Sequence, residues 1–149
     1  RINFYKKENT KQIFVEFAKD KYKVALDVNI YNFYDELLKR EYKVYKVPEF
    51  TEAKNNKKYK DKLTYKWLKE NKIKVFISND WDDFVKIIEY DFGEAIPFLL
   101  IAISENIINL GVEQASDLIA KTIRKYGYTY KGKVPLDMKS LSNINKKIK

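Results

Sequence analysis

The sequence alternates short apolar runs with amphipathic segments of helical spacing, and this alternation restricts the fold more than any other feature. Residues 23–27 form a nearly continuous apolar run that ends in an aspartate, which is typical of a buried parallel strand. In residues 30–38 the apolar side chains recur at the spacing of a helix packed on a sheet. Two β-rich runs, 42–47 and 72–78, continue the alternation. We therefore expect right-handed βαβ crossovers and an α/β fold with a mainly parallel sheet.

Helices are expected to fill most of the remaining chain. Residues 10–20 have helical spacing, and the polar, lysine-dense loop of residues 49–60 leads to a helix that begins near Asp61. Residues 95–103 are apolar enough for a buried strand or a buried helix, and Pro97 favours the helix because proline suits a first turn.

The C-terminal part is predicted to be helical and then basic. Residues 112–126 carry a regular helical stripe that ends at Gly127. From about residue 128 the chain is basic and poor in core-forming side chains, so we expect a basic C-terminal tail. Residues 1–149 are thus predicted to form one domain, a three-layer Rossmann-like sandwich with a helical C-terminal part.

The absence of both cysteine and histidine excludes most kinds of active site. Disulfides, thiolate zinc sites, Ser-His-Asp triads and histidine acid–base pairs all need one of these residues. Any catalysis must therefore use carboxylates and lysines. Because carboxylate oxygens are hard ligands, a metal bound by them would be Mg²⁺, Mn²⁺ or Ca²⁺.

The charge balance favours a polyanionic partner. The chain has 30 Lys and Arg against 21 Asp and Glu, a net charge of +9, which suits nucleic acid, although a solvated lysine-rich surface explains it equally well. No stretch approaches the roughly 20 apolar residues that cross a bilayer, and residues 1–20 are charged rather than apolar as in a signal peptide. We expect no membrane partner and a cytoplasmic location.

Aspartates follow two of the predicted strands. Asp27 ends the first, and Asp80, Asp82 and Asp83 follow the third, with Asp61 between them in sequence. In an open parallel sheet, ligands bind beyond the carboxyl ends of the strands, so both groups are expected at one point. Crowded carboxylates repel one another unless a cation neutralises them, which indicates a metal site.

A simpler explanation is open for each aspartate. Asp27 can cap the helix that follows, Asp61 can cap its own helix, and the group that starts at Asp80 can be a turn before a capped helix. The joint pattern, in a basic chain that lacks histidine and cysteine, favours the metal site.

The motifs resemble a known family. Leu26-Asp27-x-Asn29, Asp61 near a helix start and the run VFISNDWD at residues 75–82 resemble the compact PIN-like domains related to toxin ribonucleases of the PIN superfamily. In those proteins an Asp ends the first strand, an acidic residue opens a later helix, and a strand runs into a Thr/Ser-x-Asp-x-Asp-Phe element. The resemblance covers about residues 23–85, and the extra acid at Asp83 leaves open whether Asp82 or Asp83 faces the site.

The resemblance implies a metal-dependent nuclease, with RNA a more frequent substrate than DNA in the family, and often an inhibitory partner, as in toxin–antitoxin pairs, or a homodimer. Asp27 and Asp80 would bind Mg²⁺ or Mn²⁺ directly, and Asp61 and Asp82 would complete the shell or act through water. Asn29 would support a ligand or a phosphate, with Asp83 as the alternative ligand.

Basic residues in two segments are the predicted contacts to nucleic acid, because lysine binds phosphate and nearby tyrosines stack on unpaired bases. They are Lys54, Lys57, Lys58 and Lys60 in the first segment, and Arg124, Lys125 and Lys131 in the second. The second segment is also explained as an edge strand of alternating Tyr and Lys.

Two other functions remain open. One is a non-catalytic nucleic-acid-binding or regulatory protein on the same fold, whose carboxylates would lie apart and whose basic loops would form one face. The other is a toprim-like enzyme, in which Asp80-x-Asp82 would be the second motif and Asp27 would replace a glutamate.

Overall fold

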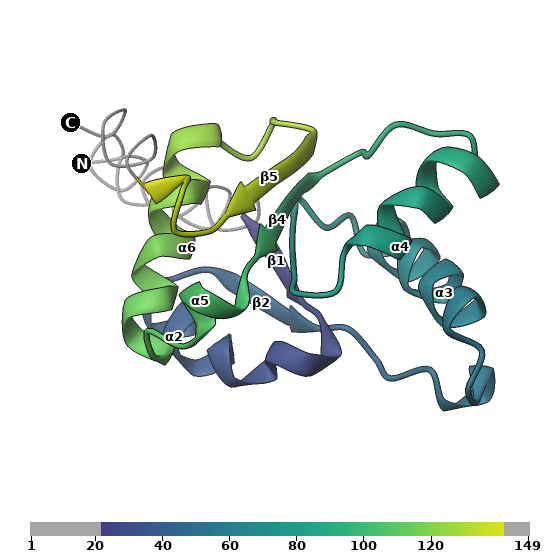
Figure 1. Ribbon diagram of the computed structural model, residues 1–149, viewed down its shortest axis with the longest axis horizontal. Coiled ribbons are helices and arrows are strands. Elements are labelled where there is room, and N and C mark those ends of the chain that lie inside the picture. Colours follow the sequence, from purple (N-terminus) through teal and green to yellow (C-terminus); the bar gives the residue numbers. More distant parts are fainter. Residues whose placement is uncertain (1–21, 142–149) are drawn as a thin grey trace, which may run out of the picture.

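One all-parallel sheet of five strands organises the protein (Figure 1). The computed structural model describes residues 22–141, so the helix expected at residues 10–20 lies outside the described residues. The strands are β1 (Lys23–Leu26), β2 (Lys43–Lys46), β3 (Val75–Ser78), β4 (Leu99–Ile103) and β5 (Gly132–Leu136), in the spatial order β2-β1-β3-β4-β5. The predicted α/β fold with a parallel sheet is confirmed.

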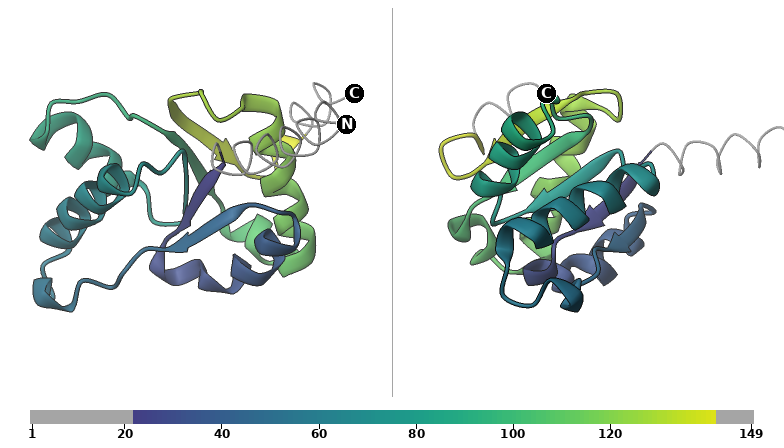
Figure 2. Two further views of the ribbon diagram at one scale, coloured as in Figure 1. Left: turned by 180° about the vertical axis from the view of Figure 1, so that it is seen from behind. Right: turned by 90° about the vertical axis from the view of Figure 1, so that its right-hand side faces the viewer.

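Helices cover both faces of the sheet (Figures 1 and 2). One face carries the 3₁₀ segment η1 (Val28–Phe33) and the helices α2 (Tyr34–Lys39), α5 (Glu105–Ile108) and α6 (Val112–Tyr126). The other carries α3 (Lys57–Glu70) and α4 (Asp82–Lys86), which continues into the π-helical turn η3 (Ile87–Asp91). A short 3₁₀ turn, η2 (Thr51–Ala53), precedes α3.

The inner strands β1, β3 and β4 each contribute to two apolar cores because successive side chains point to opposite faces. In β3, Val75 and Ile77 belong to the core beneath α2 and α6, whereas Phe76 belongs to the core beneath α3 and α4. All of these side chains are at most 1% exposed. Burial on both faces explains why the sequences of β1, β3 and β4 are almost continuously apolar.

The helix predicted for residues 95–103 is wrong, because this segment contains strand β4. All five residues of β4 are buried, and the strand lies between β3 and β5, with Ile101 paired to Ile77 on one side and Val134 on the other. A strand buried on both faces has no polar side to mark its period, so sequence spacing could not separate it from a helix. Pro97 precedes the strand instead of opening a helix.

The basic tail predicted from about residue 128 begins too early, because residues 132–136 form the edge strand β5. Val134 and Leu136 are buried, whereas Lys133 and Pro135 face outward. Proline is tolerated there because an edge strand leaves one side of its backbone unpaired. The C-terminal part is therefore mixed α/β and not helical. The helix predicted for residues 112–126 is confirmed as α6, which ends at Gly127 with φ 81°.

Among residues 22–141, no helix has the length and apolar character that crossing a bilayer requires.

Candidate functional site

Asp27 and Asp80 meet where the chain changes direction across the sheet. After β1 the chain crosses to β2 on one side, and it later returns to β3 on the other side of β1. The connections on the two sides therefore diverge between the carboxyl ends of β1 and β3, which is where open α/β sheets bind ligands. The backbone N–H of Asp27 donates to the carbonyl of Ile77 at 3.1 Å, so the two strand ends are held together. The expected convergence is confirmed for Asp27 and Asp80 but not for Asp82 and Asp83.

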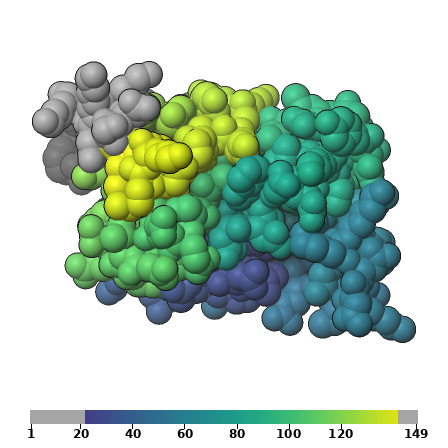
Figure 3. Space-filling model, viewed as in Figure 1, coloured from purple at the N-terminus to yellow at the C-terminus, as the bar shows by residue number. Residues whose placement is uncertain are grey.

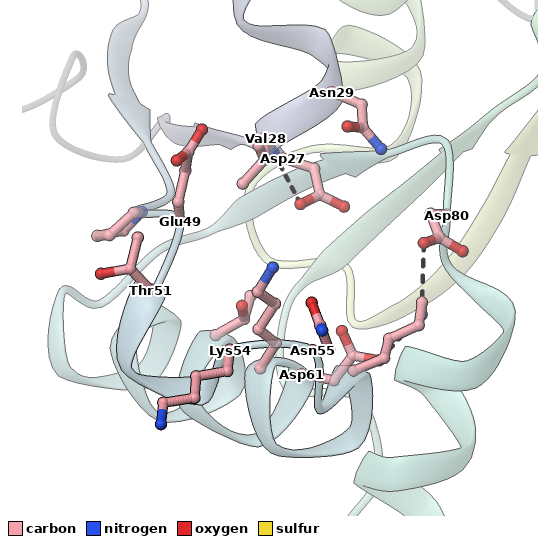
Figure 4. A pocket seen from close by; sticks show the side chains of 13 residues that line it. Asp27, Val28, Asn29, Glu49, Thr51, Lys54, Asn55, Asp61 and Asp80 are labelled. Atoms are coloured by element: carbon pink, nitrogen blue, oxygen red, sulfur yellow. Dashed lines mark hydrogen bonds and ion pairs between the residues drawn. The ribbon is translucent and has the colours of Figure 1, made fainter.

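A pocket of about 490 Å³ opens at this point, and we call it the aspartate pocket (Figure 4). Asp27 and Asp80 come from the sheet edge, and Asp61 faces them from α3. The space-filling view places the segment after β1 beside the chain that leads into α3 (Figure 3). The other lining residues are Val28, Asn29, Pro48, Glu49, Thr51, Lys54, Asn55, Lys57, Lys60 and Thr64.

Asp27 both caps a helix and lines the pocket. Its Oδ1 accepts a hydrogen bond from the N–H of Val28 at 2.8 Å, at the start of η1, and its Oδ2 accepts one from the hydroxyl of Ser78 at 2.7 Å. The capping explanation is therefore confirmed, and the same side chain also faces the pocket. Burial raises the pKa of Asp27, the hydrogen bonds from Ser78 and Val28 oppose the rise, and the charge of Asp80 adds to it.

Ser78 links the two strand-end aspartates. This side chain is completely buried, donates to Asp27 and accepts the backbone N–H of Asp80 at 3.0 Å. It therefore holds the turn after β3 against the carboxylate of Asp27. The sequence motif contains Ser78, but only the pairing of β1 with β3 reveals this role.

Asp61 is not a helix cap. The cap of α3 is Asn56, whose side chain accepts the N–H of Tyr59 at 3.0 Å, so Asp61 lies in the second turn. Its side chain is only 16% exposed and points into the pocket. Burial raises the pKa of Asp61; Lys57 opposes the rise, whereas the charges of Asp27 and Asp80 add to it. Two aspartates in this pocket thus have raised pKa values.

The raised pKa of Asp27 predicts a stabilising substitution. A carboxyl whose pKa is higher in the folded chain than in the unfolded chain contributes stability below its ordinary pKa, and that contribution is lost as the pH rises through the folded value. At pH 7 the charged side chain therefore costs stability that a neutral amide does not. In EDTA, Asp27→Asn should raise Tm at pH 7, and the difference should shrink as the pH falls through the folded pKa of Asp27 towards its ordinary value of 3.8, measured by thermal denaturation followed by circular dichroism. A lower Tm at every pH would mean that the hydrogen bonds from Ser78 and Val28 outweigh the cost of burial.

Lys57 lies among the carboxylates. Its Nζ is 3.3 Å from Asp61 Oδ2, 3.3 Å from Asp80 Oδ2 and 3.7 Å from Asp83 Oδ2. Burial lowers the pKa of the Lys57 ammonium, but the charges of Asp61 and Asp80 outweigh this and the pKa is raised. The predicted phosphate contact is thus engaged with the predicted metal ligands.

Asp82 does not reach the pocket. Its side chain is 68% exposed and pairs with Lys86 at 3.4 Å within α4. Asp83 lies nearer, through its contact with Lys57, but it lines a neighbouring groove and not the aspartate pocket. Because α4 begins at Asp82, after its N-cap residue Trp81, the side chains of its first two residues do not line the pocket at the end of β3.

Glu49 lines the pocket but was not predicted to do so. It follows β2, whose carboxyl end lies beside that of β1 because Leu26 pairs with Lys46. The hydroxyl of Tyr31 donates to the carbonyl of Val47 and ties this segment to η1. The sequence contained a signal for Glu49, since this acid follows a predicted strand and all strands of a parallel sheet end at the same edge. Asn29 lines the pocket as expected.

The predicted basic residues fall on two distant surfaces. Lys54, Lys57 and Lys60 line the aspartate pocket, and Lys58 pairs with Asp91 at 3.1 Å beside it. The second group, Arg124, Lys125 and Lys131, lies where α6 ends and β5 begins. In a parallel sheet this is the opposite edge, the edge of the strand N-termini. The structure therefore does not join the two segments into one surface.

The pocket matches a divalent ion in ligand type. Its acids are carboxylates, which Mg²⁺ and Mn²⁺ prefer, and burial raises the pKa values of Asp27 and Asp61, with a smaller contribution from neighbouring carboxylates. Within residues 22–141, however, no three carboxylates form a metal-binding cluster, and Lys57 lies between Asp61 and Asp80. The carboxylates that could bind a metal thus line one pocket, and the ammonium group of Lys57 occupies the space between two of them, Asp61 and Asp80.

Comparison of the chain with family models, curated proteins and solved structures gives no match.

Proposed function

We propose that the protein is a divalent-metal-dependent nuclease, most active on RNA, with a three-layer PIN-like sandwich fold. The observation that carries the proposal is the meeting of Asp27, Asp61 and Asp80 in one pocket, although 53 positions separate the first from the last. Lysines line the same pocket, so a phosphodiester would enter a site that holds both kinds of charge.

The roles of the residues follow from their positions. Asp27, Asp61 and Asp80 would hold Mg²⁺ or Mn²⁺, and the chemistry that such an ion supplies is charge stabilisation at the phosphate and activation of water. Ser78 and the N–H of Val28 orient Asp27. In hydrolysis the water oxygen bonds to phosphorus, one P–O ester bond breaks, and the departing oxygen takes up a proton and leaves as a hydroxyl group.

Pocket residues that are not aspartates would bind the substrate. Lys54 and Lys60 line the pocket and make no ion pair with any other residue in the described range, so their ammonium groups are available to phosphates. Asn29 is exposed at the rim and would donate a hydrogen bond to a phosphate oxygen.

Removal of the metal should abolish cleavage. We expect a fluorescent single-stranded RNA to be cut in Mn²⁺ or Mg²⁺ and to remain intact in EDTA. Metal should also raise Tm, because an ion that binds only the folded chain stabilises it by about 2.7 kcal/mol at a hundredfold excess over Kd.

Two results would count against the proposal. Equal cleavage in EDTA would reject a metal-dependent mechanism. RNA binding without cleavage, and without a shift in Tm, would favour the non-catalytic regulatory protein. That alternative is supported by the engagement of Lys57 with the aspartates and is opposed by their convergence.

A further inference from the structure

Lys57 stands at a position that local helix electrostatics disfavour. It is the first residue of α3, where the positive end of the helix dipole repels a cation, and the first turn of this helix contains no acidic residue. Its placement is explained by a local ion pair with Asp61, one turn later in α3, and by tertiary contacts with Asp80 and Asp83 at the end of β3 and the start of α4.

The contacts of Lys57 distinguish it from the other lysines of the pocket. Lys54 and Lys60 make no ion pair within the part of the chain that the structure describes, whereas the Lys57 ammonium is within 3.7 Å of three carboxylates. The side chain of Lys57 is 47% exposed. A compact ammonium on a flexible four-carbon stem can therefore leave the carboxylates without disturbing the core.

An ammonium and a divalent ion cannot share the space between Asp61 and Asp80, because both are cations and each needs the same carboxylate oxygens. The lysine offsets the repulsion between these acids while no metal is bound. When a bound metal offsets this repulsion instead, the ammonium of Lys57 no longer has carboxylates to pair with. A phosphate bound in the pocket then provides a new anionic partner for the lysine.

We propose that Lys57 is an internal counter-cation that a divalent metal displaces, and that the freed ammonium then binds a phosphate of the substrate. This inference rests on the proposed function. It makes metal and nucleic acid bind cooperatively, because each favours the arrangement in which Lys57 has left the aspartates.

The test measures Mn²⁺ affinity by electron paramagnetic resonance of the free ion, in the full chain without nucleic acid. Lys57→Ala should bind Mn²⁺ about fivefold more tightly than the parent, the factor expected when the ion pairs of Lys57 with Asp61 and Asp80 no longer compete with the metal. Lys60→Ala is the matched control, since it removes one positive charge from the same pocket without removing an ion pair. It should change the affinity by less than about twofold.

A second measurement tests the coupling. A phosphorothioate-substituted RNA ten-mer should tighten Mn²⁺ binding more in the parent than in Lys57→Ala, because only the parent gains a freed ammonium. Lys57→Gln, which keeps most of the stem, should behave like Lys57→Ala and serves if the alanine variant does not fold by circular dichroism.

The possible failures are distinguishable. If the parent cleaves RNA and the Lys57 variants keep the parent affinity for Mn²⁺, the counter-cation is rejected and the nuclease stands. An equal increase in Mn²⁺ affinity in Lys57→Ala and Lys60→Ala also rejects the counter-cation role, because the loss of one positive charge anywhere in the pocket then explains the effect. A parent that neither binds Mn²⁺ nor cleaves RNA overturns both proposals.

Discussion

Asp27→Asn is expected to reduce the rate of RNA cleavage by about 10²- to 10⁴-fold, the range seen when a group that acts at the reacting centre is removed. The substitution keeps the size of the side chain and an oxygen that accepts the N–H of Val28, but it removes the negative charge that the metal requires. Initial rates on fluorescent single-stranded RNA at saturating Mn²⁺ measure the effect.

Asp82→Asn is the matched control for this experiment. Asp82 belongs to the same acidic stretch in sequence, yet its side chain pairs with Lys86 away from the pocket. Its rate should stay within about twofold of the parent, as for an exposed surface change. Equal losses in the two variants would show that the pocket does not define the active site.

The stability of Asp27→Asn separates a chemical effect from unfolding. Burial of the charged carboxylate raises its pKa, so the neutral amide is expected to melt at a higher temperature in EDTA at pH 7. A variant that is inactive but more stable is still folded, so its loss of activity comes from the missing carboxylate. Such an opposition between activity and stability is common at active sites.

Phe76→Ala should lower the free energy of unfolding by about 3–5 kcal/mol, the cost of removing a buried aromatic ring and leaving a cavity. Phe76 is 1% exposed, in the middle of β3, and its ring centroid lies 5.2 Å from that of Phe84 and 6.1 Å from that of Phe98. The ring thus joins the central strand to α4 and to the segment that enters β4. Urea denaturation followed by circular dichroism measures the change.

Tyr90→Ala is the control for this stability measurement. Tyr90 is also aromatic, but its side chain is 78% exposed. Its substitution should change the free energy of unfolding by no more than about 0.5 kcal/mol. A similar cost for both variants would contradict the position of Phe76 inside the core.

The arrangement of charges bears on the choice between catalysis and regulation. A non-catalytic nucleic-acid-binding protein was expected to have separated carboxylates and one continuous basic face. Asp27, Asp61 and Asp80 instead line one pocket, and Arg124 and Lys125 lie at the opposite edge of the sheet from it. Both observations favour the nuclease as the proposal to test first.

The spacing of apolar residues in the sequence identified the helices and strands whose buried and exposed parts differ clearly. The stripe of α6 was readable because one side of this helix is buried and the other exposed, and β1 and β3 were readable as apolar runs that each end before a polar turn. The same approach failed for β4, where all five residues are buried, and for β5, where only Val134 and Leu136 are buried. An element with no contrast, or with little burial, carries a weak periodic signal.

The α/β class, the restriction to carboxylate and lysine chemistry and the positions of Asp27 and Asp80 at strand ends are readable from the chain alone, because they depend on residue type and short-range spacing. Tertiary structure decided which acids meet. It brought Asp61 and Glu49 into the pocket, turned Asp82 away and placed Lys57 among the carboxylates. The physical reason is that strand order and helix rotation set the direction of each side chain, and both arise from packing between segments distant in the chain.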